Sequence, residues 1–290
     1  MSLPSLALPA GACDCHVHVV GDAQQYPMVN ERHYTPAPAN HDALLEHMKR
    51  NDLQRVVIIQ PSFYGTDNRC MMDSLARLQG AGRGIAVLHN DVDSDTLKQF
   101  HQAGIRGIRI NVESAGKGNP QALENLLRHW SSRISHLNWH LQIYVDHQTI
   151  AQIAKTINTL DVPVVLDHFA MIPADSSMDN ESLKSILTLI ESGNAYIKLS
   201  APYRIAQNNS IVATKKLAQA FITANSERIL WGSDWPHTNR EPGKLAHEVS
   251  CYRDLSPTYL LDSIESWFPS TSIRQQVMTI NPAKLYGFST

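Results

Sequence analysis

Short apolar, β-branched segments alternate along the chain with segments in which apolar residues recur every three to four positions. The first pattern is typical of buried strands and the second of one-sided helices. We expect strands over residues 12–18, 55–62, 84–90, 104–111, 140–146, 162–168, 195–200 and 228–234. We expect helices over residues 41–51, 71–80, 94–103, 121–136, 149–160, 181–192 and 211–224, with further helical segments over 256–268 and 272–279. This alternation implies parallel strands joined by helical crossovers.

Eight such strands predict a (β/α)8 TIM barrel, a fold that typically needs about 250 residues plus insertions. The chain has 290 residues and contains no linker, repeat or low-complexity tract that would divide it. We therefore expect one domain over residues 1–290. An open, doubly wound sheet is the structural alternative, but no glycine-rich phosphate loop follows the first predicted strand.

Composition excludes several classes of partner. The formal charge of -2 offers no electrostatic reason to bind nucleic acid or an anionic membrane surface. The first residues do not form a signal peptide, and no apolar run reaches the length of about 18 residues expected for a membrane span. The four cysteines form no CxxC zinc pattern, which favours a reducing compartment. We expect a cytoplasmic protein, either a monomer or a small homo-oligomer.

Reactive side chains gather where the predicted strands end, which is where a barrel of this class places its active site. These residues are His16, His18, Ser62, Arg109, Asn111, Tyr144, Asp146, His168, Ser200 and Asp234. Asp and Ser often cap the helix that follows a strand, so Ser62 or Asp146 alone does not indicate an active site. Charged and imidazole groups from several strands carry more weight, because a buried charge needs a partner or a ligand.

The first strand carries the closest pair of imidazoles, His16 and His18. Alternation along a strand predicts that Asp14, His16 and His18 share the inner face of the barrel. Cys13, Cys15, Val17 and Val19 would then face the surrounding helices. By the same argument Val164, Leu166 and His168 share a face, as do Leu230, Gly232 and Asp234.

Several motifs together resemble the amidohydrolase superfamily. They are Cys13-Asp14-Cys15-His16-Val17-His18, Trp231-Gly232-Ser233-Asp234-Trp235-Pro236-His237 and the closing Asn281-Pro282-Ala283-Lys284-Leu285-Tyr286-Gly287-Phe288. Within that superfamily, the segments 32–36, 60–65, 107–111 and 167–168 are similar to a lactonase branch. The resemblance implies a hydrolase that opens the ring of a carboxylated lactone such as 2-pyrone-4,6-dicarboxylate.

The resemblance also implies roles for individual residues. Asp234 would be the general base that activates water, and His16, His18 and His168 would stabilise the oxyanion. Substrate carboxylate or hydroxyl groups would be bound by Tyr34, Ser62, Arg109, Tyr144, Arg204 and His237. An arginine expected shortly after Asn111 is absent, and Lys117 is the residue that could substitute for it. The substrate could therefore also be a monocarboxylated lactone or a sugar-acid lactone.

We expect no required cofactor, although His16, His18, His168 and Asp234 could hold one zinc ion. The enzymatic alternatives are a zinc-dependent decarboxylase of the same superfamily and a sugar-acid lactonase or isomerase. A third class is a non-catalytic binding protein on a barrel scaffold. If the histidines act without metal, their ordinary pKa near 6.5 predicts a pH dependence of hydrolysis.

Overall fold

The computed structural model describes residues 7–112, 119–206 and 210–289, and it contains the eight-stranded parallel sheet expected from the sequence. Its strands lie in the order β1, β3, β4, β5, β6, β7, β8 and β9, each paired in parallel with the next. Their bounds are Cys13–Val17, Arg55–Ile59, Gly82–Ala86, Ile105–Asn111, His140–Tyr144, Val164–Leu166, Ala195–Leu199 and Ile229–Trp231. Each of the eight predicted strands is present, and most are shorter than expected at their carboxyl ends.

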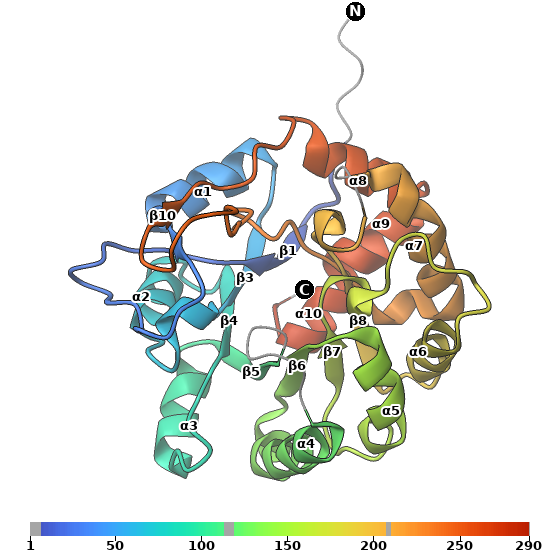
Figure 1. Ribbon diagram of the computed structural model, residues 1–290, viewed down its shortest axis with the longest axis horizontal. Coiled ribbons are helices and arrows are strands. Elements are labelled where there is room, and N and C mark those ends of the chain that lie inside the picture. The colour runs from blue at the N-terminus through green and yellow to red at the C-terminus, as the bar shows by residue number, and fades with distance from the viewer. Residues whose placement is uncertain (1–6, 113–118, 207–209, 290) are drawn as a thin grey trace, which may run out of the picture.

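Helices surround these strands (Figure 1). They are α1 (His41–Arg50), α2 (Arg69–Arg77), α3 (Ser94–Gln102), α4 (Pro120–Ile134), α5 (His147–Ile157), α6 (Glu181–Glu191), α7 (Ile211–Asn225), α8 (Tyr259–Trp267), α9 (Thr271–Gln275) and α10 (Asn281–Tyr286). The alternation of strand and helix confirms the TIM-barrel prediction. Within the described residues, no helix combines the length and the apolar character needed to cross a membrane.

The barrel closes between its first strand and the segment that follows its last one. The backbone N–H of Asp234 donates to the carbonyl of His16 at 2.9 Å, and that of His18 donates to the carbonyl of Trp235 at 2.8 Å. Gly232 permits this approach, because a Cβ at that position would lie 2.6 Å from the Cβ of His16. The two segments with the strongest chemical signals are therefore hydrogen-bonded to each other. We call this junction the seam.

The alternation predicted for the first strand is right for Val17 and Val19, which pack in the outer core, and for His16 and His18. It is wrong for the residues before His16. Cys13 and Cys15 lie inside the barrel, in a buried cluster with residues of β3, β4, β7, β8, β9 and the C-terminal helix, such as Leu230 and Tyr286. Asp14 instead points outward, where its Oδ2 accepts a hydrogen bond from Nε2 of His47 on α1 at 3.0 Å. The physical reason is a bulge in β1: its register against β3 shifts between Asp14 and Val17, which reverses the alternation before the histidines.

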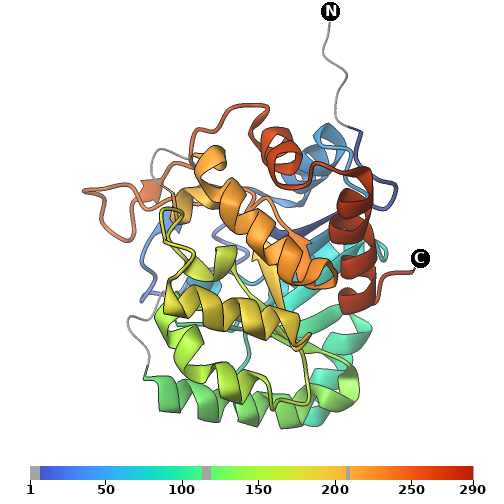
Figure 2. The same cartoon turned by 90° about the vertical axis from the view of Figure 1, so that its right-hand side faces the viewer.

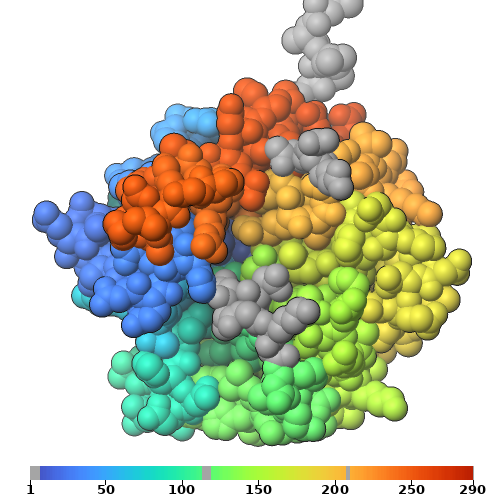
Figure 3. Space-filling model, viewed as in Figure 1, coloured from blue at the N-terminus to red at the C-terminus, as the bar shows by residue number. Residues whose placement is uncertain are grey.

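The two ends of the barrel are covered differently (Figure 2). At one end, a long segment over residues 239–253, which we call the strap, follows the last strand. Its strand β10 (Val249–Ser250) pairs in parallel with β2 (Thr35–Pro36), and Figure 3 shows this orange segment lying over the blue one. At the other end, α10 closes the floor. There Arg83 donates hydrogen bonds to the carbonyls of Tyr286 and Gly287.

Candidate active site

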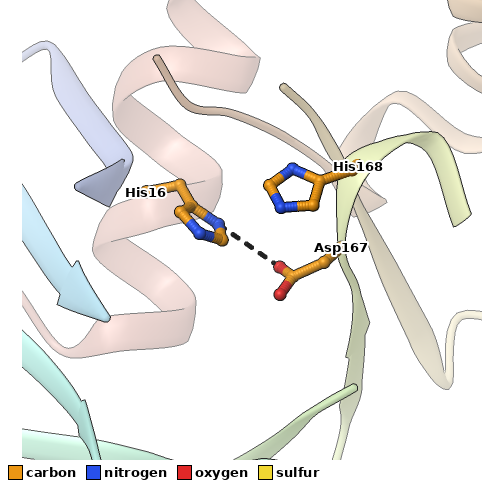
Figure 4. Close-up of side chains that lie close together, drawn as sticks. All are labelled: His16, Asp167 and His168. Atoms are coloured by element: carbon orange, nitrogen blue, oxygen red, sulfur yellow. Dashed lines mark ion pairs between the residues drawn. The ribbon is translucent and has the colours of Figure 1, made fainter. Parts of the chain in front are cut away.

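Three buried side chains meet at the carboxyl ends of the strands: His16, Asp167 and His168 (Figure 4). Nδ1 of His16 lies 3.4 Å from Oδ1 of Asp167. The rings of His16 and His168 are 4.7 Å apart between centroids. His16 also faces Asp234, with Nε2 3.6 Å from Oδ1. The structure thus brings together the residues that sequence reasoning chose as the catalytic group, and it adds Asp167.

His168 reaches this cluster by an unusual backbone path. In β7 the interior residue is Val165, so regular alternation would put Asp167 inside the barrel and His168 outside. The four residues from His168 to Met171 all have positive φ, between 49° and 55°. This left-handed turn, which L-residues rarely adopt, brings the ring of His168 back toward His16. The predicted shared face of Val164, Leu166 and His168 is therefore wrong, although His168 still lies at the cluster.

Asp167 belongs to a buried polar layer beneath the histidines. Its Oδ2 accepts a hydrogen bond from Gln142 Nε2 at 3.0 Å, and its Oδ1 lies 3.7 Å from Nζ of Lys198. Lys198 is fully buried and donates to Gln142 Oε1 at 2.7 Å. Burial alone would raise the pKa of Asp167, but His16 and Lys198 hold it well below its usual range. Sequence reasoning missed Asp167 as a site residue because it grouped Val164 and Leu166 with His168, whereas Val165 is the interior residue and Asp167 follows it in alternation.

Asp234 is fully buried, and its two carboxylate oxygens have different surroundings. Oδ2 accepts hydrogen bonds from Tyr203 Oη at 2.7 Å and from Arg204, whose Nη2 and Nε lie at 2.8 Å and 3.2 Å. Oδ1 has no hydrogen-bond partner among the described residues and faces His18 Nε2 at 3.5 Å. Burial would raise the pKa of Asp234, but Arg204 and the histidines hold it well below its usual range. One carboxylate oxygen of Asp234 is therefore hydrogen-bonded to Tyr203 and Arg204, and the other faces the histidines without a hydrogen bond from any residue that the structure describes.

The protonation of the histidines follows from their partners. Burial lowers the pKa of His16 to about 3 and that of His168 well below its usual value, so both rings are neutral near neutral pH. The expected titration near pH 6.5 is therefore wrong for these two residues. Nδ1 of His16 lies 3.4 Å from Asp167 and Nε2 lies 3.6 Å from Asp234, so a neutral ring with its proton on Nδ1 leaves a lone pair on Nε2. His18 directs Nδ1 at the carbonyl of Ile59 at 2.8 Å, so this nitrogen donates.

These tautomers bear on whether the site suits a metal ion. Nε2 of His16, Nε2 of His18 and Oδ1 of Asp234 lie within 4.8 Å of one another, a ligand set that fits a divalent cation. His168 groups with His16 and Asp167 instead, so the four residues expected to hold zinc do not form a single cluster of that spacing. Zinc bound there would polarise a carbonyl group or lower the pKa of a bound water.

A cavity of about 230 Å³ opens above the cluster. Its wall includes His18 and His168 together with most of the side chains expected to bind substrate: Tyr34, Ser62, Arg109, Tyr144 and Arg204. His237 is the exception. It contacts Tyr203 and lines a neighbouring pocket with His47 and Trp235. Asp146 lies outside the cavity wall, because its side chain caps α5 by accepting a hydrogen bond from the N–H of Thr149 at 2.9 Å.

Among the described residues, four arginines stand in the cavity wall and no Asp or Glu lines it. Arg109 donates from Nη1 to the carbonyl of Gln60 at 2.9 Å, and its buried Nε has no partner among the described residues. Arg204 is occupied by Asp234. Arg240 and Arg253 come from the strap, and sequence reasoning missed them because it considered only residues at strand ends. The proposed substitute Lys117 lies outside the described residues.

A second carboxylate, Asp14, holds the seam in place. Its Oδ1 accepts hydrogen bonds from the N–H of His16 at 3.1 Å and the N–H of Ser233 at 2.9 Å. Its Oδ2 bonds His47, whose ring stacks on that of Trp235 at 5.3 Å between centroids. Asp14 therefore fixes the backbone on both sides of the cluster from the helix side of the barrel. The sequence suggested that Asp14 faces the barrel interior with the two histidines. It is not among the residues that line the cavity.

Comparison with known proteins gives a consistent result. The amidohydrolase family model matches residues 13–288. The 2-pyrone-4,6-dicarboxylate hydrolase of Comamonas testosteroni is 30% identical over 98% of this chain and 93% of its own length. The 4-sulfomuconolactone hydrolase of Hydrogenophaga intermedia is 26% identical over 97% and 90% of the two chains. A solved structure from Agrobacterium tumefaciens covers 99% of each chain with a TM-score of 0.83 at 21% identity.

Proposed function

The chain belongs to the amidohydrolase family, and from this membership and the geometry of the cavity we propose that it hydrolyses a lactone that carries carboxylate groups. One observation carries the proposal: a cavity walled by four arginines, with no Asp or Glu among the described residues that line it, lies directly on a cluster of histidines and Asp234. Arg204 is paired with Asp234, whereas Arg109, Arg240 and Arg253 form no ion pair among the described residues, and such a cationic wall favours an anionic small molecule. The two curated relatives, which are named as hydrolases of anionic lactones, support the same substrate class.

In the proposed reaction, Oδ1 of Asp234 accepts a proton from water as the water oxygen bonds to the lactone carbonyl carbon. Oδ1 is suited to this role because Tyr203 and Arg204 occupy the other oxygen. The ring C–O bond then breaks, and the proton held by Asp234 passes to the departing oxygen. The strongly lowered pKa of Asp234 keeps it ionised throughout the neutral range, so Oδ1 carries no proton when water binds.

The histidines have different parts in this scheme. Nδ1 of His168 lies 2.8 Å from the hydroxyl of Ser200. If that hydroxyl donates to Nδ1, the neutral ring carries its proton on Nε2 and can donate it to the oxyanion. If the neutral ring of His16 carries its proton on Nδ1, its Nε2 can accept a hydrogen bond from the attacking water, and we assign it that role. Ser62, Tyr34, Tyr144 and Arg109 would bind substrate carboxylate or hydroxyl groups, with arginine favoured for its planar fork.

We also propose that this hydrolysis requires no metal. The charge balance of the cluster supports this view: Asp167 is paired with Lys198 and Asp234 with Arg204, so each buried carboxylate already has a cationic partner. Three of the donors, from His16, His18 and Asp234, nevertheless fit a divalent cation. A zinc-dependent decarboxylase is therefore the second candidate, since it would use the same residues and retain a metal.

A panel of lactones assayed before and after chelation tests the proposal. The panel contains 2-pyrone-4,6-dicarboxylate, a monocarboxylated pyrone and a sugar-acid lactone, and an aromatic carboxylic acid is added to detect decarboxylation. We expect ring opening of a carboxylated lactone, undiminished by chelation. Release of carbon dioxide that depends on zinc would favour the decarboxylase. Absence of turnover on every compound would favour a binding protein.

A further inference from the structure

Two arginines of the strap, Arg253 and Arg240, stand in the wall of the catalytic cavity although neither lies at a strand end. We propose that they bind a second anionic group of the substrate, opposite the group held by Arg109. The preferred substrate is then a lactone with two separated anionic groups. This inference rests on the proposed lactonase function and specifies its substrate.

The cavity has distinct cationic sides. Arg109 borders it where it adjoins a pocket of about 260 Å³ that also contains Arg32 and His33. Arg253 borders it where it adjoins a different pocket, which contains His47 and Trp235. Arg109 and Arg253 therefore border the cavity next to two different neighbouring pockets, with His18 and His168 also in the wall. An anion bound to Arg109 leaves the positive charges of Arg240 and Arg253, on the strap side of the cavity, without an anionic partner among the described residues.

Arg204 is a poor candidate for binding the second anionic group, because its charge is already paired with Asp234. Its Nε and Nη2 both donate to Asp234, an ion pair with 2.8 Å between Nη2 and Oδ2. Arg253 differs, because its buried Nε has no hydrogen-bond partner among the described residues. A buried, unpartnered guanidinium nitrogen loses its hydration without compensation, and a bound carboxylate would restore the missing hydrogen bond. Arg240 is exposed and lies at the same wall.

The surroundings of Arg253 hold it in position. Its guanidinium carbon lies 4.6 Å from the ring centroid of Tyr203, the residue that donates to Asp234. Its backbone N–H donates to the carbonyl of His237 at 2.9 Å. A cation stacked on an aromatic face loses little further freedom when it binds a ligand. Arg253 is therefore arranged in advance to accept an anion close to the reacting group.

The strap itself is anchored, so its arginines are not on a free loop. Strand β10 pairs with β2, and the hydroxyl of Thr35 donates to the carbonyl of Ala246 at 2.7 Å. The hydroxyl of Tyr252, next to Arg253, donates to the carbonyl of Ala37. These contacts tie the strap to the segment that also carries Tyr34, another residue of the cavity wall. Both substrate-facing segments are thus fixed to each other.

Paired substrates test the inference. Steady-state kinetics on 2-pyrone-4,6-dicarboxylate and on a monocarboxylated 2-pyrone would be compared for wild type, Arg253→Gln, Arg240→Gln and Arg253→Lys. The exposed Arg77→Gln, whose partner is Asp42 on α1, controls for net charge. We expect Arg253→Gln to raise KM for the dicarboxylate about 10- to 100-fold, the loss expected for a charged hydrogen bond. Turnover of the monocarboxylate should stay within a few-fold, and Arg253→Lys should recover part of the loss.

A smaller effect of the same kind is expected for Arg240→Gln, because this side chain is exposed to solvent. An equal loss on both substrates, or no loss on either, in a variant that melts with wild-type cooperativity would overturn the inference. Binding of a non-reactive dianion, benzene-1,3-dicarboxylate, measured by calorimetry against benzoate, separates this result from the proposed function. If no lactone is turned over but the dianion binds through Arg253, the anion site stands and the lactonase proposal fails. If lactones are hydrolysed but Arg253→Gln affects the dicarboxylate and the monocarboxylate equally, the lactonase proposal stands and the anion site at Arg253 fails.

Discussion

The guanidinium group of Arg204 lies on the carboxylate of Asp234, with Nη2 2.8 Å and Nε 3.2 Å from the same oxygen. The sequence suggested that Arg204 binds substrate directly, and the two roles predict different kinetics. As the partner of Asp234, Arg204 is a main cause of the low pKa of that carboxylate. Its removal would therefore change the acid–base behaviour of the site as well as substrate affinity.

We expect Arg204→Gln to move the acidic limb of the kcat profile to higher pH, so that the variant loses kcat at acidic pH values where wild type is still fully active. The sign follows from the charge: without the cation the pKa of Asp234 rises, so a higher pH is needed to keep the base ionised. Wild type should show no loss of kcat due to Asp234 between pH 5 and 8. Arg204→Lys should fall between the two. A rise in KM alone, with kcat and its pH profile unchanged, would make Arg204 only a substrate anchor.

Asp234→Asn should preserve the fold and substrate binding but lower turnover about 100-fold or more, because general-base contributions are commonly of that size. The matched control is Asp146→Asn, which changes another carboxylate at a strand end. Asp146 caps α5, and asparagine is an equally good cap, so this variant should keep wild-type activity and stability. If Asp234→Asn turns over within a few-fold of wild type, the base is another residue.

Chelation should leave turnover unchanged. The reason is the existing pairing of Asp167 with Lys198 and of Asp234 with Arg204. The measurement is metal content by elemental analysis beside the hydrolysis rate, before and after dialysis against a chelator. Added zinc should inhibit by occupying His16, His18 and Asp234. Activity that disappears on dialysis and returns in proportion to bound zinc would show that the metal is required.

The cysteines offer a test of the corrected alternation in β1. Cys13 and Cys15 are buried in the barrel interior, Cys70 is buried beside Val19, and Cys251 is exposed on the strap. In the folded protein we expect the thiol of Cys251 to react with a thiol reagent and the other three thiols to be protected. Replacing Cys13 or Cys15 with alanine should destabilise the protein by roughly 0.5–3 kcal/mol, the usual range for a core change. A second fast-reacting thiol that mapped to Cys13 or Cys15 would contradict the interior placement.

The barrel was predictable because eight apolar segments separated by one-sided helices leave few other architectures, and each predicted strand is present. The alternation of side chains was less predictable. A strand period of two assigns faces correctly only where the strand is regular, as in residues 107–111 of β5, where Ile108 and Ile110 pack outward and Arg109 points inward. The bulge before His16 and the left-handed turn at His168 both break that regularity, and neither has a glycine or proline that would signal it.

The remaining parts of the site could not be read from strand ends at all. Asp167 precedes the residue that sequence reasoning chose, and Lys198 lies one position inside its strand, so both belong to the layer below the surface of the cavity. Arg240 and Arg253 reach the cavity only because the strap folds back over the barrel and pairs with β2. That return path depends on contacts between segments distant in sequence, which local patterns do not encode.

The seam has a consequence for the order of folding. Ser233 donates its N–H to Asp14, a residue 219 positions earlier in the chain, and Asp234 donates its N–H to His16. Contacts of such long separation carry the largest loop-closure cost, so adjacent strand–helix units form before them. On the ribosome, a chain that has not yet released Trp235 from the exit tunnel can hold folded barrel segments but no assembled His–Asp centre. Catalytic competence is therefore acquired in one late step, when the first and last strands of the barrel meet.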